Sequence, residues 1–457
     1  MSEPAWVEHA VFWQLYPLGF VGADIDPGDR SIDRPVEHRL GRIIGWLDYA
    51  VELGVSGIAL GPLFASQTHG YDTVDFFRID PRLGDEGDFA ALIGAAHERG
   101  LRVVLDGVFN HVGREFGPFE RVVASGAGSG ESPLRWFRLT GRGPSGDPVF
   151  ENFEGHDALV ALNHDEPAVA DFVTHVMTYW LDRGVDGWRL DAAYAVPSAF
   201  WATVLPRVRA THPDVYIFGE VIHGDYADSV AEGTLDSLTQ YELWKAIWSS
   251  ISDANFFELA AALDRHNAFL SSFTPVTFVG NHDVSRLATV LDDPRHREHA
   301  HVILLTVGGT PTIYYGDEQG FTGLKEERVG GDDAIRPGFP ADGHAALPAD
   351  GWNTYRLHQN LIGLRRRHPW LHRAQSTTIA LTNTFYVYEV RSGADSLVVA
   401  LNVGDRDETF ERGRGGGAFD VLAGSARVSS GGGAAATAPT DAVTVTVPAH
   451  GWAVLGA

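Results

Sequence analysis

Residues 101–113 read LRVVLDGVFNHVG, and residues 185–194 read VDGWRLDAAY. Each stretch opens on a short apolar run and closes on charged or polar residues. A short apolar run of this kind is typical of a strand buried in a parallel sheet. The polar residues that follow then lie at the carboxyl end of the strand, which is where barrel proteins place their working residues.

Six more runs of this kind recur along the first 320 residues, with longer amphipathic, helix-like stretches between them. Together with the two quoted above, the runs begin at Val11, Val55, Leu101, Val185, Val215, Leu235, Val276 and Thr312. Strands that alternate with helices indicate a parallel sheet covered on both faces, and eight strands close a (β/α)8 barrel. The sequence therefore predicts an α/β fold built on a TIM barrel.

Two parts of the chain do not follow this alternation. Residues 112–165 carry clusters of Gly, Pro and Ser with aromatic residues between them, so we expect a small inserted domain, domain B, after the third strand. Beyond residue 372 the segments alternate as antiparallel strands do, which predicts a C-terminal β-sandwich domain over residues 373–457. The barrel is then expected to comprise residues 1–111 and 166–372.

Composition limits the function. The chain has 457 residues with 35 Lys plus Arg and 60 Asp plus Glu, which gives a formal net charge of −25 at pH 7. Such a field repels phosphate backbones and acidic lipids, so neither nucleic acid nor a membrane is an expected partner. The absence of cysteine excludes disulfides and cysteine nucleophiles. Because no secretory signal and no long apolar stretch is visible, we expect a cytoplasmic protein.

Four of the predicted strands end in polar or ionisable residues, which a barrel brings to one face. They include Asp106, Asn110, His111, Arg189, Asp191, Glu220, His223, Asn281, His282, Asp283 and Arg286. Arg189 and Asp191 are two residues apart, so their side chains project to the same side of the strand. The guanidinium keeps Asp191 ionised as a nucleophile, whereas apolar neighbours suit Glu220 to hold and donate a proton. Two carboxylates in opposite protonation states are what cleavage of a glycosidic bond requires.

Simpler explanations exist for the separate pieces. A single carboxylate at a strand end is usually a solvated loop residue or a helix N-cap, but that does not explain four such strand ends together. The histidine spacings form no zinc motif, so no metal site is predicted and no cofactor is expected to be required. A structural Ca²⁺ held by Asn110 and oxygens of domain B stays open. The tract SGAGSGES lacks the lysine of a phosphate-binding loop, so we expect a flexible loop there.

The motifs DGVFNHVG, GVDGWRLDAA, FGEV and FVGNHDVSR follow one another along the chain. In order and spacing they resemble the four conserved regions of the α-amylase family, glycoside hydrolase family 13. The resemblance implies a retaining mechanism on α-glucosidic bonds, with Asp191 as the nucleophile, Glu220 as the general acid and base, and Asp283 gripping sugar hydroxyls. By the same resemblance, the substrate-binding residues would be Tyr71, Asp72, His111, Arg189, His282 and Arg336, with Asp106 supporting Arg189.

Within that family, HGYDTVDFF and FGEVIHGDY are most similar to the branch of cyclomaltodextrinases, neopullulanases and maltogenic amylases. Gly70 stands where this branch has a lysine, and Ile222 stands where it has a tryptophan. The N-terminal β domain usual in the branch is not seen, so its domain-mediated dimer does not follow and a homodimer stays open. These departures fit a short relative similar to the cyclic maltosyl-maltose hydrolases.

The resemblance implies a hydrolase of α-1,4-glucosidic bonds in malto-oligosaccharides or in small cyclic glucans, such as cyclomaltodextrins or cyclic maltosyl-maltose. An α-glucosidase or transglucosylase is the alternative, because a sugar can intercept the covalent intermediate as water does. A non-catalytic carbohydrate-binding protein is a lesser alternative, since all three carboxylates are present. Trp136, Phe137 and Trp352 are candidate sugar platforms, although ordinary packing explains them at least as well.

Overall fold

The computed structural model divides the chain into two compact units. The first unit comprises Met1–Val7, Phe12–Thr239 and Arg336–Leu347, and the second comprises Glu8–Val11, Gln240–Ile335 and Pro348–Ala457. The residues that the structure describes are 3–26, 28, 33–125, 135–144, 146–328, 330–413, 420–430 and 442–456. The tract SGAGSGES, for which we predicted a flexible loop, lies almost wholly outside the described residues.

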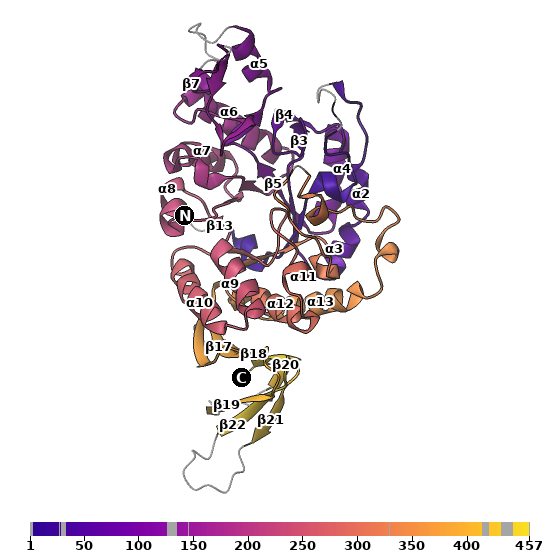
Figure 1. Cartoon of the computed structure of the whole chain (residues 1–457), viewed down its shortest axis with the longest axis vertical. Coiled ribbons are helices and arrows are strands. Elements are labelled where there is room, and N and C mark those ends of the chain that lie inside the picture. The colour runs from indigo at the N-terminus through magenta and orange to yellow at the C-terminus, as the bar shows by residue number, and fades with distance from the viewer. Residues whose placement is uncertain are drawn as a thin grey trace. The chain divides into compact units, whose positions relative to one another are not determined.

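Six parallel strands form the sheet of the first unit, in the order β13-β12-β11-β5-β2-β1. Figure 1 labels β5 and β13 of this sheet. Their bounds are β1 (Phe12–Leu15), β2 (Gly57–Leu60), β5 (Arg102–Gly107), β11 (Gly187–Leu190), β12 (Tyr216–Gly219) and β13 (Ser237–Leu238). The residues of β1, β2, β11 and β12 are buried throughout. Burial on both faces explains why the sequence shows continuous apolar runs here.

The helices of the first unit lie between these strands in the chain. They are α1 (Pro17–Phe20), α2 (Leu40–Ile44), α3 (Leu47–Leu53), α4 (Glu86–Glu98), α5 (Gly117–Ala124), α6 (Pro167–Leu181), α7 (Ser198–Thr211) and α8 (Tyr226–Gly233), with the 3₁₀ turns η4 (Ala193–Ala195) and η8 (His344–Ala346). The turn η1 (Ala5–His9) runs from the first unit into the second. Asp85 and Asp88 form a capping box at the start of α4, which fixes where this helix begins.

Smaller sheets extend the first unit after its second and third barrel strands. They comprise β3 (Phe64–Ser66) with β4 (Thr73–Ile79), then β6 (His111–Gly113), β10 (His156–Ala161) and β9 (Asn152–Phe153), and β7 (Leu139–Arg142) with β8 (Pro148–Phe150). Phe119 packs edge-on against Phe137 and Phe150, with ring centroids 5.1 and 5.0 Å apart. Three aromatic residues of the predicted domain B therefore pack together as a small core.

The second unit contributes two further parallel strands, β14 (Val276–Phe278) and β15 (Thr310–Tyr314). Its helices and 3₁₀ turns are α9 (Tyr241–Ser252), α10 (Phe256–Leu270), α11 (Leu287–Val290), α12 (Arg297–Thr306), α13 (Gly351–Arg367), η5 (Pro294–His296), η6 (Asp317–Gln319), η7 (Asp333–Ile335) and η9 (Pro369–Arg373). The eight-stranded parallel sheet thus takes six strands from the first unit and two from the second. The eight predicted strands of the (β/α)8 barrel are confirmed.

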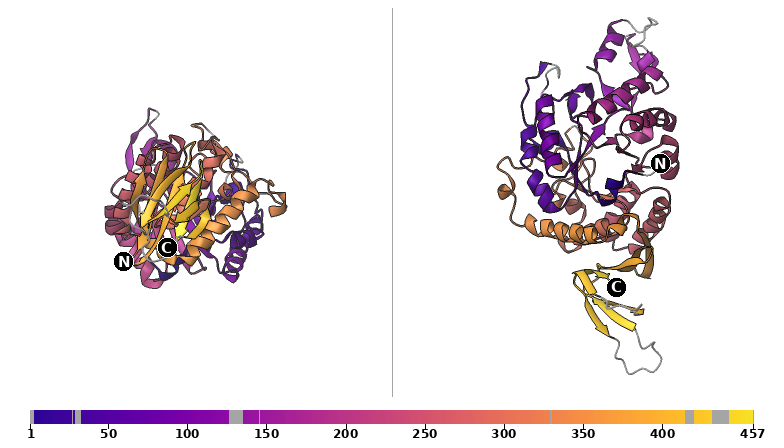
Figure 2. Two further views of the ribbon diagram at one scale, coloured as in Figure 1. Left: turned by 90° about the horizontal axis from the view of Figure 1, so that it is seen from below. Right: turned by 180° about the vertical axis from the view of Figure 1, so that it is seen from behind.

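Antiparallel strands make up the C-terminal part of the second unit (Figures 1 and 2). One sheet has the order β16-β17-β18-β23-β20 and the other β19-β22-β21. The bounds are β16 (Gln375–Leu381), β17 (Phe385–Ser392), β18 (Asp395–Asn402), β19 (Glu408–Gly413), β20 (Asp420–Gly424), β21 (Arg427–Ser430), β22 (Ala442–Val447) and β23 (Trp452–Gly456). One buried cluster joins residues of both sheets, among them Val387, Leu455, Phe410 and Val445. The predicted β-sandwich is therefore present.

The β-sandwich is fastened to barrel helices of the same unit. Asn267 of α10 donates to the carbonyl of Ser376 and accepts from its N–H, both at 2.8 Å. The limits given above for the barrel, domain B and the C-terminal domain stay predictions. Among the described residues, no helix has the length and apolar character needed to traverse a bilayer.

Candidate active site

Asp106 and Arg189 are register partners on the neighbouring strands β5 and β11. Nη1 of Arg189 donates to both carboxylate oxygens of Asp106, at 2.7 and 2.6 Å. Both side chains are buried. The parallel register therefore places a fixed ion pair at the carboxyl end of the sheet, as expected for a residue that supports Arg189.

The same guanidinium contacts two further carboxylates. Nη1 of Arg189 donates to Oδ1 of Asp191 at 3.2 Å, and Nη2 lies 2.7 Å from Oε1 of Glu220. We call Arg189 with Asp106, Asp191 and Glu220 the carboxylate cluster. Burial alone would lower the pKa of Arg189, but the attraction of Asp106 and Glu220, with Asp191, raises it well above its ordinary value. Arg189 is therefore a permanent cation among three acids.

Asp191 and Glu220 are each the first residue beyond a strand, on β11 and β12. The backbone N–H of Asp191 donates to the carbonyl of Gly107, and that of Glu220 donates to the carbonyl of Leu190. The sheet ladder thus continues through both residues. Because the backbone is held, the two carboxylates have defined positions at one end of the sheet.

Ala192 follows Asp191 with a left-handed backbone, at φ 46°. In this conformation its N–H donates to Oε2 of Glu220 at 3.1 Å. A non-glycine residue adopts a left-handed conformation at an energetic cost, and such strain gathers at functional sites. The strained turn gives Glu220 a second fixed partner besides Arg189.

Tyr71 and His111 lie next to the carboxylate cluster in the first unit. The hydroxyl of Tyr71 donates to Oδ2 of Asp106 at 3.1 Å. Nε2 of His111 lies 2.9 Å from the carbonyl oxygen of Tyr71, and its Nδ1 lies 3.1 Å from the side-chain amide nitrogen of Asn110. Burial lowers the pKa of His111 to about 4. These contacts assign a neutral ring that carries its proton on Nε2.

Asp72 and Arg336 belong to the first unit but have structural partners of their own. The carboxylate of Asp72 accepts from the N–H and the hydroxyl of Thr68, the latter at 2.6 Å. The guanidinium of Arg336 lies over the ring of Tyr16, 4.7 Å from its centroid. Burial raises the pKa of Tyr16 to about 12, and its hydroxyl donates to the carbonyl of His69. Their predicted substrate contacts stay predictions.

His282 and Asp283 belong to the second unit. Nε2 of His282 lies 3.0 Å from Oδ2 of Asp283, and the side chain of Asp283 is 34% exposed. The N–H of Asp283 donates to Oδ1 of Asn281, and the side-chain amide of Asn281 donates to the hydroxyl of Tyr241. The loop after β14 therefore holds Asp283 in a fixed position with one face toward solvent.

Two neighbours of the predicted site were missed by reasoning from sequence. The ring of Phe153 stacks on His111, with centroids 4.7 Å apart and planes 19° apart. The hydroxyl of Tyr194 donates to Glu154, and burial together with this carboxylate raises the pKa of Tyr194. Phe153 and Glu154 come from the segment predicted as domain B. No barrel strand was predicted in this segment, so the sequence did not show which of its side chains would face the site.

The candidate sugar platforms pack as ordinary aromatic residues. Trp136 lies 5.0 Å from the ring of Phe172, and Trp352 lies 5.1 Å from that of Tyr355. Phe137 is buried against Phe119, as described above. Packing is therefore the explanation that the structure supports for all three.

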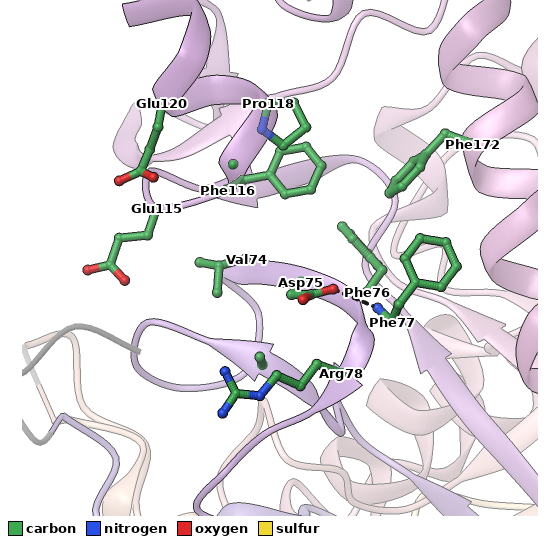
Figure 3. A pocket seen from close by; sticks show the side chains of 12 residues that line it. Val74, Asp75, Phe76, Phe77, Arg78, Glu115, Phe116, Pro118, Glu120 and Phe172 are labelled. Carbon is green, nitrogen blue, oxygen red and sulfur yellow. Dashed lines mark hydrogen bonds between the residues drawn. The ribbon is translucent and has the colours of Figure 1, made fainter. Parts of the chain in front are cut away.

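A separate pocket of about 300 Å³ lies in the first unit (Figure 3). It is lined by residues of β3, β4, α5 and α6 and by Glu115 and Phe116, rather than by the carboxylate cluster. Figure 3 shows the phenylalanines on one side and the carboxylates of Glu115 and Glu120 on the other. This pocket is distinct from the candidate active site.

Residues 14–345 match the family model described as the catalytic domain of alpha amylase. The chain belongs to the alpha-amylase family. The family predicted from the four motifs is thus confirmed, and the carboxylate cluster lies within the matched region.

Two sequence relatives within the alpha-amylase family show how much of a longer protein the chain matches. It is 33% identical over 424 residues to a cyclomaltodextrinase of Geobacillus thermopakistaniensis (strain MAS1), covering 88% of this chain and 70% of that protein. It is 32% identical over 342 residues to an intracellular maltogenic amylase of Bacillus subtilis (strain 168), covering 70% and 57%. The second match spans under two thirds of that relative's length.

A solved structure of similar size comes from the same family. The cyclic alpha-maltosyl-(1→6)-maltose hydrolase of Arthrobacter globiformis, in complex with its cyclic tetrasaccharide, aligns with a TM-score of 0.81 at 26% identity. The alignment covers 100% of both chains. The predicted likeness to cyclomaltodextrinases and to cyclic maltosyl-maltose hydrolases is therefore confirmed at the level of similarity.

Proposed function

We propose that this protein is a retaining glycoside hydrolase that cleaves α-1,4-glucosidic bonds of malto-oligosaccharides or small cyclic glucans. One observation carries the proposal: Arg189 holds Asp191 and Glu220 through separate nitrogen atoms of a single guanidinium. Two carboxylates at the ends of the neighbouring strands β11 and β12, one to attack and one to donate a proton, are the groups that retaining hydrolysis needs.

In the first step, an oxygen of Asp191 attacks the anomeric carbon and the bond from that carbon to the glycosidic oxygen breaks. Glu220 gives its proton to the departing oxygen, so the leaving group is a neutral sugar alcohol. The product is a covalent β-glucosyl ester on Asp191. In the second step, Glu220 takes a proton from water, the hydroxide attacks the anomeric carbon, and the carboxylate of Asp191 departs.

The charge balance of the carboxylate cluster suits this division of roles. Asp106, Asp191 and Glu220 present three acids to the one cation of Arg189. The cluster therefore has more acids than cations, and this excess of negative charge stabilises the positive charge that develops on the anomeric carbon in the transition state. Asp191 contacts the guanidinium at 3.2 Å, which positions the nucleophile.

The proposed substrate class rests on the relatives as well as on the site. A cyclomaltodextrinase, a maltogenic amylase and a cyclic maltosyl-maltose hydrolase are similar to this chain over most of its length. We propose Asp283 and His282 as groups that grip sugar hydroxyls, together with Tyr71, Asp72, His111 and Arg336.

A substrate screen tests the proposal. The purified protein is incubated with maltotriose, cyclomaltodextrins and the cyclic maltosyl-maltose tetrasaccharide, and released glucose and maltose are quantified. We expect release from at least one of them, with an α-anomeric product at early times by NMR. Absence of any release, or a β-anomeric product, would contradict the proposal.

An α-glucosidase or transglucosylase remains the second candidate, because the glucosyl ester on Asp191 reacts with a sugar hydroxyl as it does with water. Product analysis at high maltotriose concentration separates the two. Longer or α-1,6-linked products indicate transfer, and glucose with maltose alone indicates hydrolysis.

We further propose that the enzyme works in the cytoplasm and needs no cofactor. The relative from Bacillus subtilis is named as an intracellular enzyme, which supports the first point. The proposed chemistry uses only carboxylates, a guanidinium and water, which supports the second. Activity that survives dialysis against EDTA is expected, while a fall in thermal stability without loss of turnover would indicate a structural ion such as calcium.

A further inference from the structure

Four side chains gather in the second unit where η5 meets the loops that follow β18 and β22. This histidine cluster consists of Asp293, His296, Asp405 and His450. One carboxylate oxygen of Asp293 and one ring nitrogen of each histidine lie within 4.8 Å of one another. The two histidines are 154 residues apart in the chain, so no local motif marks the cluster.

The two imidazoles face each other through one nitrogen each. Nε2 of His296 lies 2.9 Å from Nδ1 of His450. Nε2 of His450 lies 3.0 Å from Asp405, and Asp293 lies 4.0 Å from Nδ1 of His296. With its proton on Nε2 toward Asp405, His450 presents the lone pair of Nδ1 to His296. A proton on Nε2 of His296, or a cation that replaces this proton, then fills the space between the two rings.

The protein fixes both rings in this arrangement. His450 has a left-handed backbone, at φ 55°, and its N–H donates to the carbonyl of Gly404. His296 packs edge-on against His299, whose Nε2 lies 3.1 Å from the carbonyl oxygen of Gly451. The side chains of His296 and His450 are 14% and 16% exposed, so both remain partly open to solvent.

The charges around the two rings also favour a cation. Two carboxylates, Asp293 and Asp405, lie beside the two imidazoles. Asp293 also accepts from Arg295, with Nε at 2.9 Å, so a metal would share this carboxylate with an exposed guanidinium.

We propose that Nε2 of His296, Nδ1 of His450 and the carboxylate of Asp293 bind a divalent cation of the zinc class. Two imidazoles and one carboxylate are a usual donor set for zinc, with water in the remaining position. Calcium and magnesium prefer oxygen ligands only and fit this set poorly. Asp405 orients His450 through its outer nitrogen, as carboxylates behind metal-bound histidines do.

Binding at this position has a structural consequence. Asp293 and His296 precede α12, whereas His450 lies in the loop between β22 and β23. A cation shared by them ties a barrel helix of the second unit to the β-sandwich. Because only the folded chain brings these ligands together, the metal stabilises the fold in proportion to its concentration over Kd.

Cobalt and zinc titrations of the untagged, metal-free full chain test the proposal. Co²⁺ is expected to give visible absorption bands typical of tetrahedral nitrogen and oxygen ligands, saturating at one equivalent and abolished by Zn²⁺. In thermal unfolding, Tm is expected to rise with each increase in Zn²⁺ above Kd. Wild-type protein that shows neither the bands nor the shift overturns the proposal.

Substitutions in the histidine cluster test whether the metal ion binds at this position. His450→Asn keeps a residue that tolerates the left-handed backbone but removes the imidazole, so both signals are expected to disappear. Asp405→Asn is expected to weaken binding by about 10 to 100-fold, because it removes only the orienting carboxylate. If His450→Asn fails to fold, Asp405→Asn decides, and unchanged affinity in that variant counts against the site.

A matched control is available in the first unit. His212 lies 3.2 Å from Asp182, which makes a histidine–carboxylate pair without a facing imidazole. His212→Asn is expected to keep the cobalt bands and the full Zn²⁺-dependent rise in Tm. Loss of either signal in this control would mean that the ions bind elsewhere, and the proposal would fall.

Discussion

Two buried arginines of the barrel, Arg189 in the first unit and Arg286 in the second, have opposite surroundings. Arg189 contacts three carboxylates, those of Asp106, Asp191 and Glu220. Arg286 contacts one carboxylate, Asp317 at 3.1 Å, and otherwise binds the carbonyl oxygen of Tyr315 and lies over the ring of Tyr314.

The difference lies in the balance of charge. The pair of Arg286 and Asp317 is neutral, and aromatic rings complete its surroundings, so it is suited to hold loops together. The cluster around Arg189 carries excess negative charge, which only a proton or an electron-poor substrate can relieve. The fold holds an excess of negative charge around Arg189 but not around Arg286. We infer that this excess distinguishes a reactive site from a structural ion pair.

The largest expected effect comes from removing the proposed nucleophile. Asp191→Asn keeps the size of the side chain and can still contact Arg189, so folding is expected to persist with a nearly unchanged Tm. Turnover is expected to fall by about 10⁴-fold or more, because an amide cannot form the glucosyl ester. Steady-state kinetics on the best substrate of the screen measures the loss. Unchanged turnover would revive the non-catalytic, carbohydrate-binding alternative.

Arg286→Met should act on stability instead. The substitution leaves the buried carboxylate of Asp317 without its cation, which costs about 3–5 kcal/mol when a buried pair is broken. Urea unfolding followed by circular dichroism measures this change. The turnover of the protein that remains folded is expected to stay near the wild-type value, and a specific loss of turnover would erase the contrast between the two arginines.

Arg189→Lys tests the other member of the comparison. A lysine keeps the charge, but one ammonium cannot hold Asp191 and Glu220 through separate nitrogens as the guanidinium does. Misplacing reacting groups by about 1 Å costs on the order of 100-fold in rate, so kcat is expected to fall by that factor. The loss is expected in kcat more than in KM. A change confined to KM would show that Arg189 only contacts bound sugar.

Much of this contrast was visible in the sequence, and part of it was not. The two-residue spacing of Arg189 and Asp191 placed both side chains on one side of a strand, and the structure confirms their contact. The contact of Arg189 with Glu220 could not be derived, because it depends on the register of β11 against β12. Register between parallel strands is set by packing across the whole sheet rather than by local residues.

Contacts between segments that are far apart in the chain could not be predicted from the sequence either. The stacking of Phe153 on His111 depends on how the segment after β8 folds back, and nothing in its composition fixes that path. The pairing of His296 with His450 joins parts of the chain that only tertiary packing brings together. Eight apolar runs, in contrast, were enough to predict the barrel strands. A strand that is buried on both faces of the sheet consists mainly of apolar residues, and this is visible in the sequence.

The stability of the second unit is expected to depend on pH through a buried histidine. Burial lowers the pKa of His266 in the second unit to about 4, and its Nε2 lies 2.8 Å from the carbonyl oxygen of Gly308. In the unfolded chain the ring titrates near 6.5, so its stabilising effect is complete above that pH and is lost as pH falls toward 4. Between pH 7.5 and 5.5 this group alone should cost about 1.4 kcal/mol of stability.

His266→Gln removes that titration while keeping an amide that can donate to Gly308. The difference in unfolding free energy between pH 7.5 and 5.5, measured in urea, is expected to shrink by about 1.4 kcal/mol relative to wild type. The pH dependence of kcat is expected to stay the same, because His266 contacts Gln240 and Gly308, which are not members of the carboxylate cluster. An unchanged pH dependence of stability would show that His266 is not held neutral.

The smallest effect is expected at the edge of the carboxylate cluster. Tyr71→Phe removes the hydroxyl that donates to Asp106 at 3.1 Å and keeps the ring proposed to contact the sugar. One hydrogen bond of this kind contributes about 1 kcal/mol, so kcat/KM should fall by roughly fivefold. If Tyr71 served only as a platform for the sugar, Phe would preserve kcat/KM. If the hydroxyl instead positions Asp106 and, through Asp106, Arg189, Phe cannot replace Tyr71 without loss. In that case Tyr71→Phe should cause no further fall in kcat/KM when it is added to Arg189→Lys, because both substitutions disturb the same carboxylates.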